Sequence, residues 1–310
     1  MSKKVLIFGS NGLVGSSVYE IFLNTGYKIF ASTRKDTDLF VLDEVRALID
    51  TFKPQVIINA AAKVGGILAN NTERSEFLIQ NLKINTNILE ACIPFPDIKI
   101  INLGSSCIYP LNAKNPIKES SFMDGKLEPT NSPYAMAKLT AIELGRSLNL
   151  QFGHKVINLM PTNLYGPNDN FDGEASHVIP GLINKMYHAK LNKDDKFLIW
   201  GTGSPLREFL YVDDLARGIK FIIEENIEDD LINIGSGKDS SIKDFTKLIL
   251  KIIVPNKKIS IKYDLTKPNG TPRKVLDISL AKKYGWKPNH NLKIQILKTY
   301  KAYLSKIDNK

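Results

Sequence analysis

The chain has 310 residues, of which 43% are hydrophobic and 24% are charged, and its formal net charge is +10. This length can bury the core of one large α/β domain with a smaller lobe, and the composition is that of a globular rather than a disordered protein. No apolar run approaches the roughly 18 residues of a membrane helix. Since Lys far outnumbers Arg and no basic block alternates with aromatics, we expect small anionic ligands rather than a nucleic-acid or membrane partner.

Short apolar runs alternate with helical patterns in the first half of the chain. Strands are predicted at residues 5–8, 27–31, 55–60 and 98–103, and helices at 13–23, 41–52 and 77–92. Such alternation is typical of βαβ units. It predicts an α/β fold with a doubly wound parallel Rossmann sheet, in which the loops after the strands share one edge.

Loops rich in Gly, Asn and Asp interrupt this alternation after residue 166. We therefore predict a dinucleotide-binding Rossmann domain made of residues 1–166 and 206–236. Residues 167–205 and 237–310 are predicted to form a smaller, C-terminal substrate-binding lobe.

A glycine turn lies between the first predicted strand and the first predicted helix. Its residues are Gly9, Ser10, Asn11, Gly12, Leu13, Val14 and Gly15. Glycines spaced three apart permit a tight turn and a close approach of the backbone, while the start of the helix offers N–H groups to a pyrophosphate. Its place after the first strand of a βαβ unit predicts dinucleotide binding.

Two cations, Arg34 and Lys35, follow the second predicted strand, about 20 residues beyond the glycines. NAD sites usually carry an acid there, whereas cations suit the 2′-phosphate of NADP. We therefore predict NADPH/NADP+ as the cofactor. Because the acidic residue Asp36 follows directly, NADH stays an alternative cofactor. A basic turn that is exposed to solvent and binds no cofactor is the other alternative.

Tyr134 and Lys138 are four residues apart on a predicted helix and so share one face. We expect the ammonium to lower the pKa of the phenol from its usual value of about 10, which suits a proton donor to a carbonyl that is being reduced. Ser105, just after the strand at 98–103, could hold the same carbonyl oxygen. A solvated Tyr and Lys on an amphipathic helix are the alternative, but the glycine turn and Ser105 favour carbonyl reduction.

The glycine turn, Ser105 and the Tyr134/Lys138 pair, in this order, resemble the extended short-chain dehydrogenase/reductase fold. Within it the chain is similar to the GDP-L-fucose synthase family. The closer resemblance is carried by residues 60–67 (AAAKVGGI), 103–110 (LGSSCIYP), 127–131 (LEPTN), 160–167 (MPTNLYGP), 176–180 (SHVIP), 207–210 (REFL) and 270–274 (GTPRK). It implies an NADPH-dependent homodimer that inverts C3 and C5 of GDP-4-keto-6-deoxy-D-mannose and reduces C4, forming GDP-L-fucose.

The family uses a cysteine and a histidine, matching Cys107 and His177, as base and acid on opposite faces of the sugar. Ser105 and Tyr134 would hold the enolate oxygen, and Tyr134 would later donate a proton. The ordinary pKa values of a thiol and an imidazole, about 8.5 and 6.5, bracket neutrality. Outside their sequence blocks, Cys107 would be a small buried residue and His177 a hydrogen-bonding loop residue.

The resemblance also implies ligand contacts beyond the glycine turn and Arg34. On the cofactor side these are Leu103, Gly104, Ser105, Ser106, Tyr134, Lys138, Pro161, Thr162, Asn163, Leu164 and His177. On the substrate side they are Lys185, Trp200, Arg207, Asn269 and Lys274.

Arg207 suits a diphosphate through its charge and planar geometry. Trp200 could offer an apolar face to the substrate or belong to the core of a strand. Two positions depart from the family: Lys185 stands where arginine is expected, and Asn269 stands where the KPDG pattern has aspartate. The sugar could therefore differ from that of the family.

Other functions remain open. The main alternative is a 4-reductase, with or without epimerase activity, for a related GDP-4-keto-deoxy sugar. A 4,6-dehydratase or 4-epimerase is disfavoured, since dehydratases of this superfamily carry Thr-Asp-Glu where this chain has Ser105-Ser106-Cys107. A dinucleotide-sensing protein without turnover is disfavoured by the presence of Ser105, Tyr134 and Lys138.

The cysteines, the histidines and the N-terminal residues bear on the cellular location of the protein and on whether it binds a metal ion. Cys92 and Cys107 are the only cysteines, and the apolar run at 5–8 is too short for a secretory signal, so we expect a cytoplasmic protein without disulfides. The four histidines form no close ligand pair, so we expect no metal site.

Overall fold

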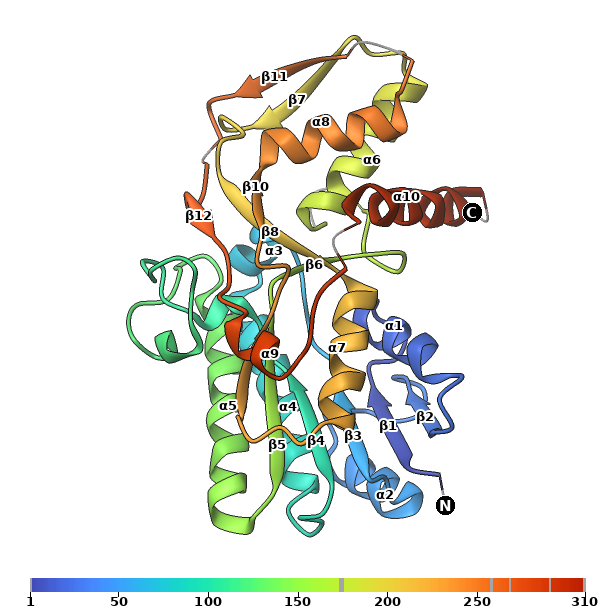
Figure 1. Ribbon diagram of the computed structural model, residues 1–310, viewed down its shortest axis with the longest axis vertical. Coiled ribbons are helices and arrows are strands. Elements are labelled where there is room, and N and C mark those ends of the chain that lie inside the picture. Colours follow the sequence, from blue (N-terminus) through green and yellow to red (C-terminus); the bar gives the residue numbers. More distant parts are fainter. Residues whose placement is uncertain (1, 173–175, 257–258, 268, 290, 309–310) are drawn as a thin grey trace.

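The computed structural model describes residues 2–172, 176–256, 259–267, 269–289 and 291–308. Two lobes lie one above the other along the long axis in Figure 1. The larger lobe contains a six-stranded sheet in the order β2-β1-β3-β4-β5-β9, with every pair parallel. Its strands are β1 (Lys4–Phe8), β2 (Lys28–Ser32), β3 (Val56–Asn59), β4 (Lys99–Leu103), β5 (Lys155–Pro161) and β9 (Leu231–Ile234). This confirms the predicted doubly wound sheet.

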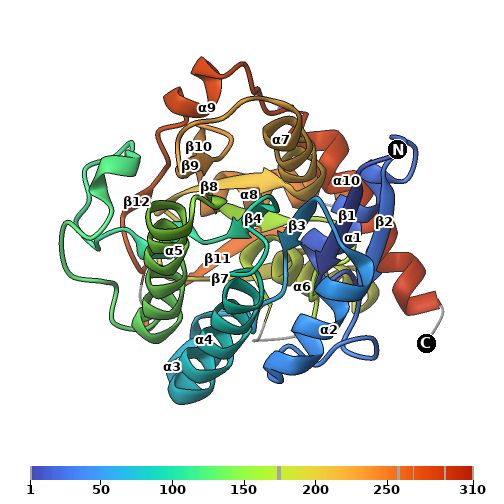
Figure 2. The same cartoon turned by 90° about the horizontal axis from the view of Figure 1, so that it is seen from below.

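Helices cover both faces of this sheet, as Figure 2 shows. One face carries α1 (Leu13–Phe22) and α7 (Val212–Glu224), and the other carries α2 (Leu42–Phe52), α4 (Arg74–Ala91) and, beside it, α5 (Ser132–Phe152). Successive side chains of a strand point to opposite faces. In β1, Val5 and Ile7 therefore join the core under α1, while Leu6 and Phe8 join the core under α2 and α4. Burial on both faces explains why these strands are continuous apolar runs.

The smaller lobe is built around β8 (Leu206–Tyr211). This strand pairs with β6 (Asn163–Tyr165), β10 (Asp239–Ser241) and β12 (Arg273–Lys274). A separate pair is formed by β7 (Lys196–Trp200) and β11 (Ser260–Asp264), and the lobe's helices are α6 (Val178–Leu191), α8 (Ile242–Ile253) and α10 (Leu292–Asp308). The short elements of the chain are α3 (Ile67–Thr72), α9 (Ser279–Lys283) and the 3₁₀ turns η1 (Ser106–Ile108) and η2 (Glu119–Ser121).

The chain crosses between the two lobes several times. β8 opens the segment 206–236 but lies in the second sheet, whereas β9, which ends that segment, lies in the first. Leu276, Ile278 and Trp286 lie beyond residue 236 and still pack into the core of the larger lobe. The predicted domain boundaries at residues 166, 206 and 236 therefore do not separate two independent cores. They stay a proposal about which segments bind the cofactor and which bind the substrate. Among the described residues, no helix has the length and apolar character needed to cross a membrane.

A row of buried asparagines crosses three adjacent strands. Asn59 Nδ2 donates to Asn102 Oδ1 (3.2 Å), Asn102 Nδ2 donates to Asn158 Oδ1 (2.9 Å), and Asn158 Nδ2 donates to the carbonyl of Asp230 (3.1 Å). The three asparagines are direct register partners in β3, β4 and β5. Since a buried polar group without a partner costs about 1–3 kcal/mol, the row favours this strand register over a slipped one.

Replacing the central member of the row should destabilise the fold. Asn102→Leu removes two side-chain hydrogen bonds and leaves the buried Oδ1 of Asn158 without its donor, while Asn59 Nδ2 keeps its bond to Asn85 (2.9 Å). We therefore expect the free energy of unfolding to fall by about 1–3 kcal/mol. Urea unfolding measures this change. Asn71→Leu, at an exposed position of α3, is the control and should change the free energy of unfolding by less than about 0.5 kcal/mol. Equal stability of Asn102→Leu and the unaltered protein would contradict a structural role for the row.

Candidate active site

The glycine turn joins β1 to α1 as predicted. Gly9 has a φ of +77°, and a Cβ there would lie 2.7 Å from the Cα of Ala61. A Cβ on Gly15 would lie 2.2 Å from the carbonyl oxygen of Gly9. The backbone N–H and the hydroxyl of Ser10 both donate to the carbonyl of Ser32, at the end of β2 (3.1 and 2.9 Å). No described side chain caps the start of α1, so its first N–H groups can bind a pyrophosphate, which fits the predicted dinucleotide.

The turn after β2 presents Arg34 and Lys35 as exposed cations. Asp36 is engaged within this turn, because its Oδ2 accepts hydrogen bonds from the hydroxyl and the N–H of Thr33 (2.6 and 2.8 Å). These two bonds lower the pKa of Asp36. The Asp36 carboxylate therefore stabilises the turn. Arg34 and Lys35 lie at the position where such folds recognise the ribose 2′-hydroxyl or 2′-phosphate of the dinucleotide. This arrangement fits NADP better than NAD.

Tyr134 and Lys138 lie on the same side of α5, and Lys138 Nζ is 5.7 Å from the centroid of the Tyr134 ring. Lys138 is buried and donates to the carbonyl of Leu103 (2.7 Å). Burial lowers the pKa of Lys138 to about 8, while Cys107 acts in the opposite direction.

The expected lowering of the Tyr134 pKa is wrong. Burial raises the pKa of this phenol, and Cys107 raises it further. Loss of hydration disfavours the charged tyrosinate. The phenol is therefore protonated near neutral pH, which is the form that a proton donor needs.

Ser105 and Cys107 meet in the turn after β4. Ser105 Oγ accepts a hydrogen bond from the N–H of Cys107 (3.3 Å) and caps η1. Burial raises the pKa of the Cys107 thiol, whereas Lys274, Ser105 and Lys138 lower it. The thiol therefore does not keep the ordinary pKa expected from the sequence, and its thiolate depends on nearby cations.

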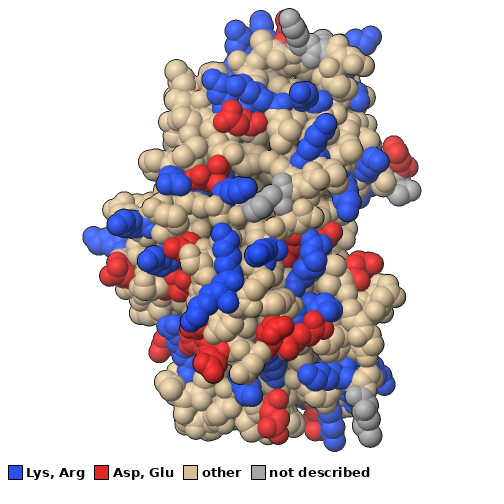
Figure 3. Space-filling view, in the orientation of Figure 1, with Lys and Arg blue, Asp and Glu red and all other residues tan. Residues whose placement is uncertain are grey.

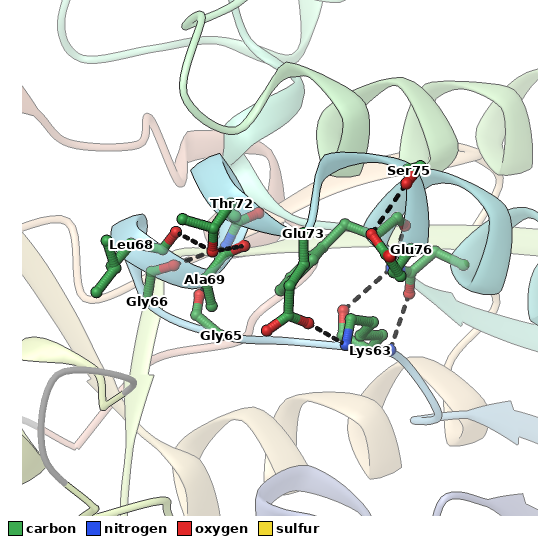
Figure 4. Close-up of polar contacts among 12 residues, drawn as sticks. Lys63, Gly65, Gly66, Leu68, Ala69, Thr72, Glu73, Ser75 and Glu76 are labelled. Atoms are coloured by element: carbon green, nitrogen blue, oxygen red, sulfur yellow. Dashed lines mark hydrogen bonds and ion pairs between the residues drawn. The ribbon is translucent and has the colours of Figure 1, made fainter.

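Helix α4 and the loop after β3 together support the ring of Tyr134. The ring of Phe77 packs edge-on against the Tyr134 ring, with centroids 6.2 Å apart. Lys63 Nζ lies 5.1 Å from the Phe77 centroid and forms an ion pair with Glu73 (2.7 Å), as Figure 4 shows. The backbone N–H and carbonyl of Lys63 both bond to the side chain of buried Asn81 (3.0 and 3.0 Å). Sequence reasoning did not assign this support, although Lys63 lies in one of the blocks that carry the family resemblance.

Arg207 and Lys274 are register partners in β8 and β12. Burial is the main cause that lowers the pKa of both side chains. Cys107 and Glu128 act to raise the pKa of Lys274, and Arg207 lowers it further. Lys274 thus interacts electrostatically with both the Cys107 thiol and Arg207. It therefore lies between the predicted catalytic residues and the arginine that is predicted to bind the diphosphate.

Trp200, at the end of β7, is 48% exposed, so it is not the strand-core residue that remained an alternative. Two ammonium groups lie near its ring: Lys185 Nζ is 4.9 Å and Lys267 Nζ is 5.3 Å from a ring centroid. An exposed aromatic ring with two cations can hold a planar, anionic ligand. Lys267 was missed by sequence reasoning; its place two residues before Asn269, at the start of the KPNG segment, was the available signal.

Asn269 closes the turn that follows Trp200. Its Oδ1 accepts hydrogen bonds from the N–H and the hydroxyl of Thr202 (2.8 and 2.9 Å). An amide oxygen accepts such bonds as a carboxylate oxygen does, so asparagine fits where the family has aspartate. A contact of Asn269 with the substrate stays a prediction.

The predicted cofactor residues 161–164 lead from β5 into β6. Thr162 N–H donates to the carbonyl of Ile234 (3.1 Å), and Asn163 Nδ2 donates to the carbonyl of Glu208 (3.0 Å). A Cβ on Gly166 would lie 3.3 Å from the Leu13 side chain, so this segment passes beside the glycine turn. On the neighbouring strand, Gly104 N–H donates to the carbonyl of Leu159 (2.9 Å), which holds residues 103–106 at the same edge.

His177 lies directly before α6, the helix that also carries Lys185. Its Nδ1 is 3.5 Å from Oδ1 of Asp169, its side chain is 42% exposed, and that of Asp169 is 4% exposed. Within the part of the chain that the structure describes, no hydrogen bond or ion pair joins His177 to Cys107, so the approach of His177 to the sugar stays a prediction. Across the same residues, no group of three or more His, Cys, Asp and Glu could hold a metal ion.

Comparisons with known proteins agree with this geometry. Residues 5–235 match the NAD-dependent epimerase/dehydratase family. The chain is 41% identical to GDP-L-fucose synthase 1 of Arabidopsis thaliana, covering 100% of this chain and 95% of that one. It is 35% identical to GDP-L-colitose synthase of Yersinia pseudotuberculosis, covering 99% of each.

A solved structure of a GDP-L-fucose synthetase from Naegleria fowleri bound to NADP superposes with a TM-score of 0.89 at 29% identity, covering 99% of this chain and 94% of that one. The fold and the relatives therefore agree over at least 99% of the chain. The chain belongs to the NAD-dependent epimerase/dehydratase family and is an NADP-dependent oxidoreductase of the GDP-L-fucose synthase type.

Proposed function

We propose that this protein converts GDP-4-keto-6-deoxy-D-mannose to GDP-L-fucose, by epimerisation at C3 and C5 and reduction at C4 with NADPH. The observation that carries this proposal is the place of Cys107, which is in hydrogen-bond contact with Ser105 and interacts electrostatically with Tyr134, Lys138 and Lys274. Reduction alone needs no thiol. A thiol beside the phenol supports proton transfer at carbons next to the same carbonyl.

In the reduction, NADPH held at the glycine turn supplies the hydride. Tyr134 gives its phenolic proton to the C4 oxygen, and the hydroxyl of Ser105 donates a hydrogen bond to that oxygen. Lys138, anchored on the carbonyl of Leu103, stabilises the negative charge left on the phenol. Each of these groups acts without leaving its place in the fold.

In the epimerisation, the C4 carbonyl makes the protons at C3 and C5 acidic, because the resulting enolate places its charge on the C4 oxygen. The thiolate of Cys107 removes a proton from one face, and His177 returns one from the opposite face. The raised pKa of Cys107 makes its thiolate the stronger base, and Lys274 and Lys138 favour the formation of that thiolate.

Cationic side chains support a nucleotide diphosphate as the anionic part of the substrate. Arg207 lies beside Lys274, and Lys185 and Lys267 flank Trp200. On the face shown in Figure 3, basic side chains dominate the smaller lobe and the middle of the molecule. A related GDP-4-keto-deoxy sugar is the second candidate substrate, because a GDP-L-colitose synthase is among the relatives.

We also infer a cytoplasmic homodimer. Cys92 and Cys107 are both free thiols, as in a reducing compartment. The adjacent helices α4 and α5 carry the exposed apolar side chains Ile79 and Met136, which support a helix-bundle interface between two copies.

Replacing the thiol should separate epimerisation from cofactor binding. Cys107→Ser removes the base, so we expect exchange of the C3 and C5 protons with deuterated water to slow by about 10²-fold or more, with unchanged NADPH affinity. Exchange is measured by NMR and affinity by fluorescence titration. Cys92→Ala, at the remote second thiol, is the control and should exchange at the normal rate. Full exchange by Cys107→Ser would remove Cys107 from the mechanism.

The reduction rate should depend on the charge of Lys138. Because the pKa of Lys138 is lowered to about 8, its ammonium is present below that pH and is lost as the pH rises through it. With a saturating 4-keto substrate already inverted at C3 and C5, so that thiolate formation does not limit the rate, we expect NADPH oxidation to be constant below pH 8 and to decline above it. A rate that stays constant up to the ordinary lysine pKa of about 10.4 would show that this charge does not assist the reduction.

The proposed dimer can be tested by light scattering after gel filtration. The unaltered protein should have twice the mass of one chain, and Ile79→Asp should shift it to the monomer because a carboxylate would be buried in the interface. Leu191→Asp, at an exposed position in the smaller lobe, is the matched control and should remain dimeric. A monomeric unaltered protein would refute the dimer.

A further inference from the structure

Asp169 is a buried carboxylate that the mechanism above does not use. Its Oδ1 lies 3.5 Å from Nδ1 of His177 and accepts a hydrogen bond from the N–H of Asn170 (2.8 Å). Its Oδ2 and the Nδ1 of His177 are both buried, and neither has a hydrogen-bond partner among the described residues. The Asp169 carboxylate thus retains an oxygen without a partner and lies beside a ring nitrogen that has none, so the carboxylate and an Nδ1–H group are complementary to one another.

The loop that carries Asp169 is fixed against two helices of the smaller lobe. Lys306 of α10 donates to the backbone carbonyl of Asp169 (3.3 Å). Two residues along, the carbonyl of Phe171 accepts a hydrogen bond from Asn184 of α6 (2.8 Å), and its ring lies 4.9 Å from that of Tyr303 of α10. Because α6 begins directly after His177, these contacts hold the carboxylate in a set position relative to the imidazole.

We propose that Asp169 is a positioning residue for His177: it accepts a hydrogen bond from Nδ1–H and thereby directs Nε2 toward the sugar. In a neutral imidazole one nitrogen donates and the other accepts, and the partner of one nitrogen decides the role of the other. The separation of 3.5 Å is longer than the usual roughly 2.7–3.2 Å, and catalytic hydrogen bonds commonly shorten when substrate binds.

The proton transfers balance in this arrangement, which rests on the proposed epimerisation. Cys107 begins as a thiolate and ends as a thiol after it takes a proton from the sugar. The Nε2–H bond of the His177 imidazolium breaks as a C–H bond forms on the opposite face, which leaves a neutral ring. The Nδ1–H bond stays intact and hydrogen-bonded to the Asp169 carboxylate throughout, and the carboxylate compensates the positive charge of the ring while that charge is present.

Ring nitrogen NMR tests the contact without any substrate. The protein is labelled with ¹⁵N in its histidine rings, and the His177 signals are identified by their loss in His177→Gln. We expect the Nδ1–H tautomer in the unaltered protein and in Asp172→Asn, an exposed carboxylate of the same loop, but a shift toward Nε2–H in Asp169→Asn. An Nε2–H tautomer in the unaltered protein would overturn the proposal, even if Asp169→Asn fails to fold.

Kinetics then separates positioning from general structural damage. In Asp169→Asn we expect kcat for C3 and C5 inversion to fall about tenfold, part of the roughly 10²–10⁴-fold that acid–base catalysis contributes, with KM and NADPH affinity unchanged. A loss in KM or NADPH affinity alone, or an equal loss in Asp172→Asn, would overturn the positioning role. If the unaltered protein inverts neither carbon, the proposed function fails, while the NMR result still decides the contact between Asp169 and His177.

Discussion

The active site depends on one buried ammonium and the carbonyl that it bonds. Lys138 is 2% exposed, and a buried cation without a polar partner would be strongly unfavourable. Its bond to the carbonyl of Leu103 ties α5 to the last residue of β4, directly before the turn that carries Ser105 and Cys107. Because Tyr134 lies one turn earlier on α5, the same bond helps to hold the phenol in electrostatic contact with the thiol.

The electrostatics of the site follow from this packing. Dehydration raises the pKa of both the phenol and the thiol, so each holds its proton more firmly than it would in water. The nearby cations, Lys274 and Lys138, and the hydrogen bond with Ser105 favour the thiolate form of Cys107. Lys274 comes from the distant strand β12, which pairs with β8. Glu208 of β8 anchors that strand, because its carboxylate accepts hydrogen bonds from the N–H groups of Gly237 (2.6 Å) and Leu276 (2.8 Å). The smaller lobe thereby places a cation in electrostatic contact with the thiol of the larger lobe.

Local sequence patterns predicted much of this arrangement. Apolar runs and the glycine turn fixed the order of the first strands and helices, and the four-residue spacing placed Tyr134 and Lys138 on one face. The asparagine row was also visible in retrospect, since an Ile-Asn pair occurs in each of β3, β4 and β5. The hydrogen-bond partners of a buried asparagine lie on the neighbouring strands. The row could therefore not be predicted without knowing the order of the strands in the sheet.

Other features depend on contacts between distant parts of the chain. The direction of the Tyr134 pKa shift follows from burial, which no local spacing reveals. The charge of Asp36 suggested an alternative cofactor until its bonds to Thr33 accounted for it. Lys267 and Asp169 have no distinctive spacing relative to Trp200 and His177, and only the folded chain places them together.

NMR of the product tests the central claim most directly. GDP-4-keto-6-deoxy-D-mannose is incubated in deuterated water with NADPH that carries deuterium at its transferable position. If one pocket performs both reactions, GDP-L-fucose will carry solvent deuterium at C3 and C5 and cofactor deuterium at C4. A product reduced at C4 with no solvent deuterium at C3 or C5 would contradict the account, because the thiol beside Tyr134 would then play no part in the reaction.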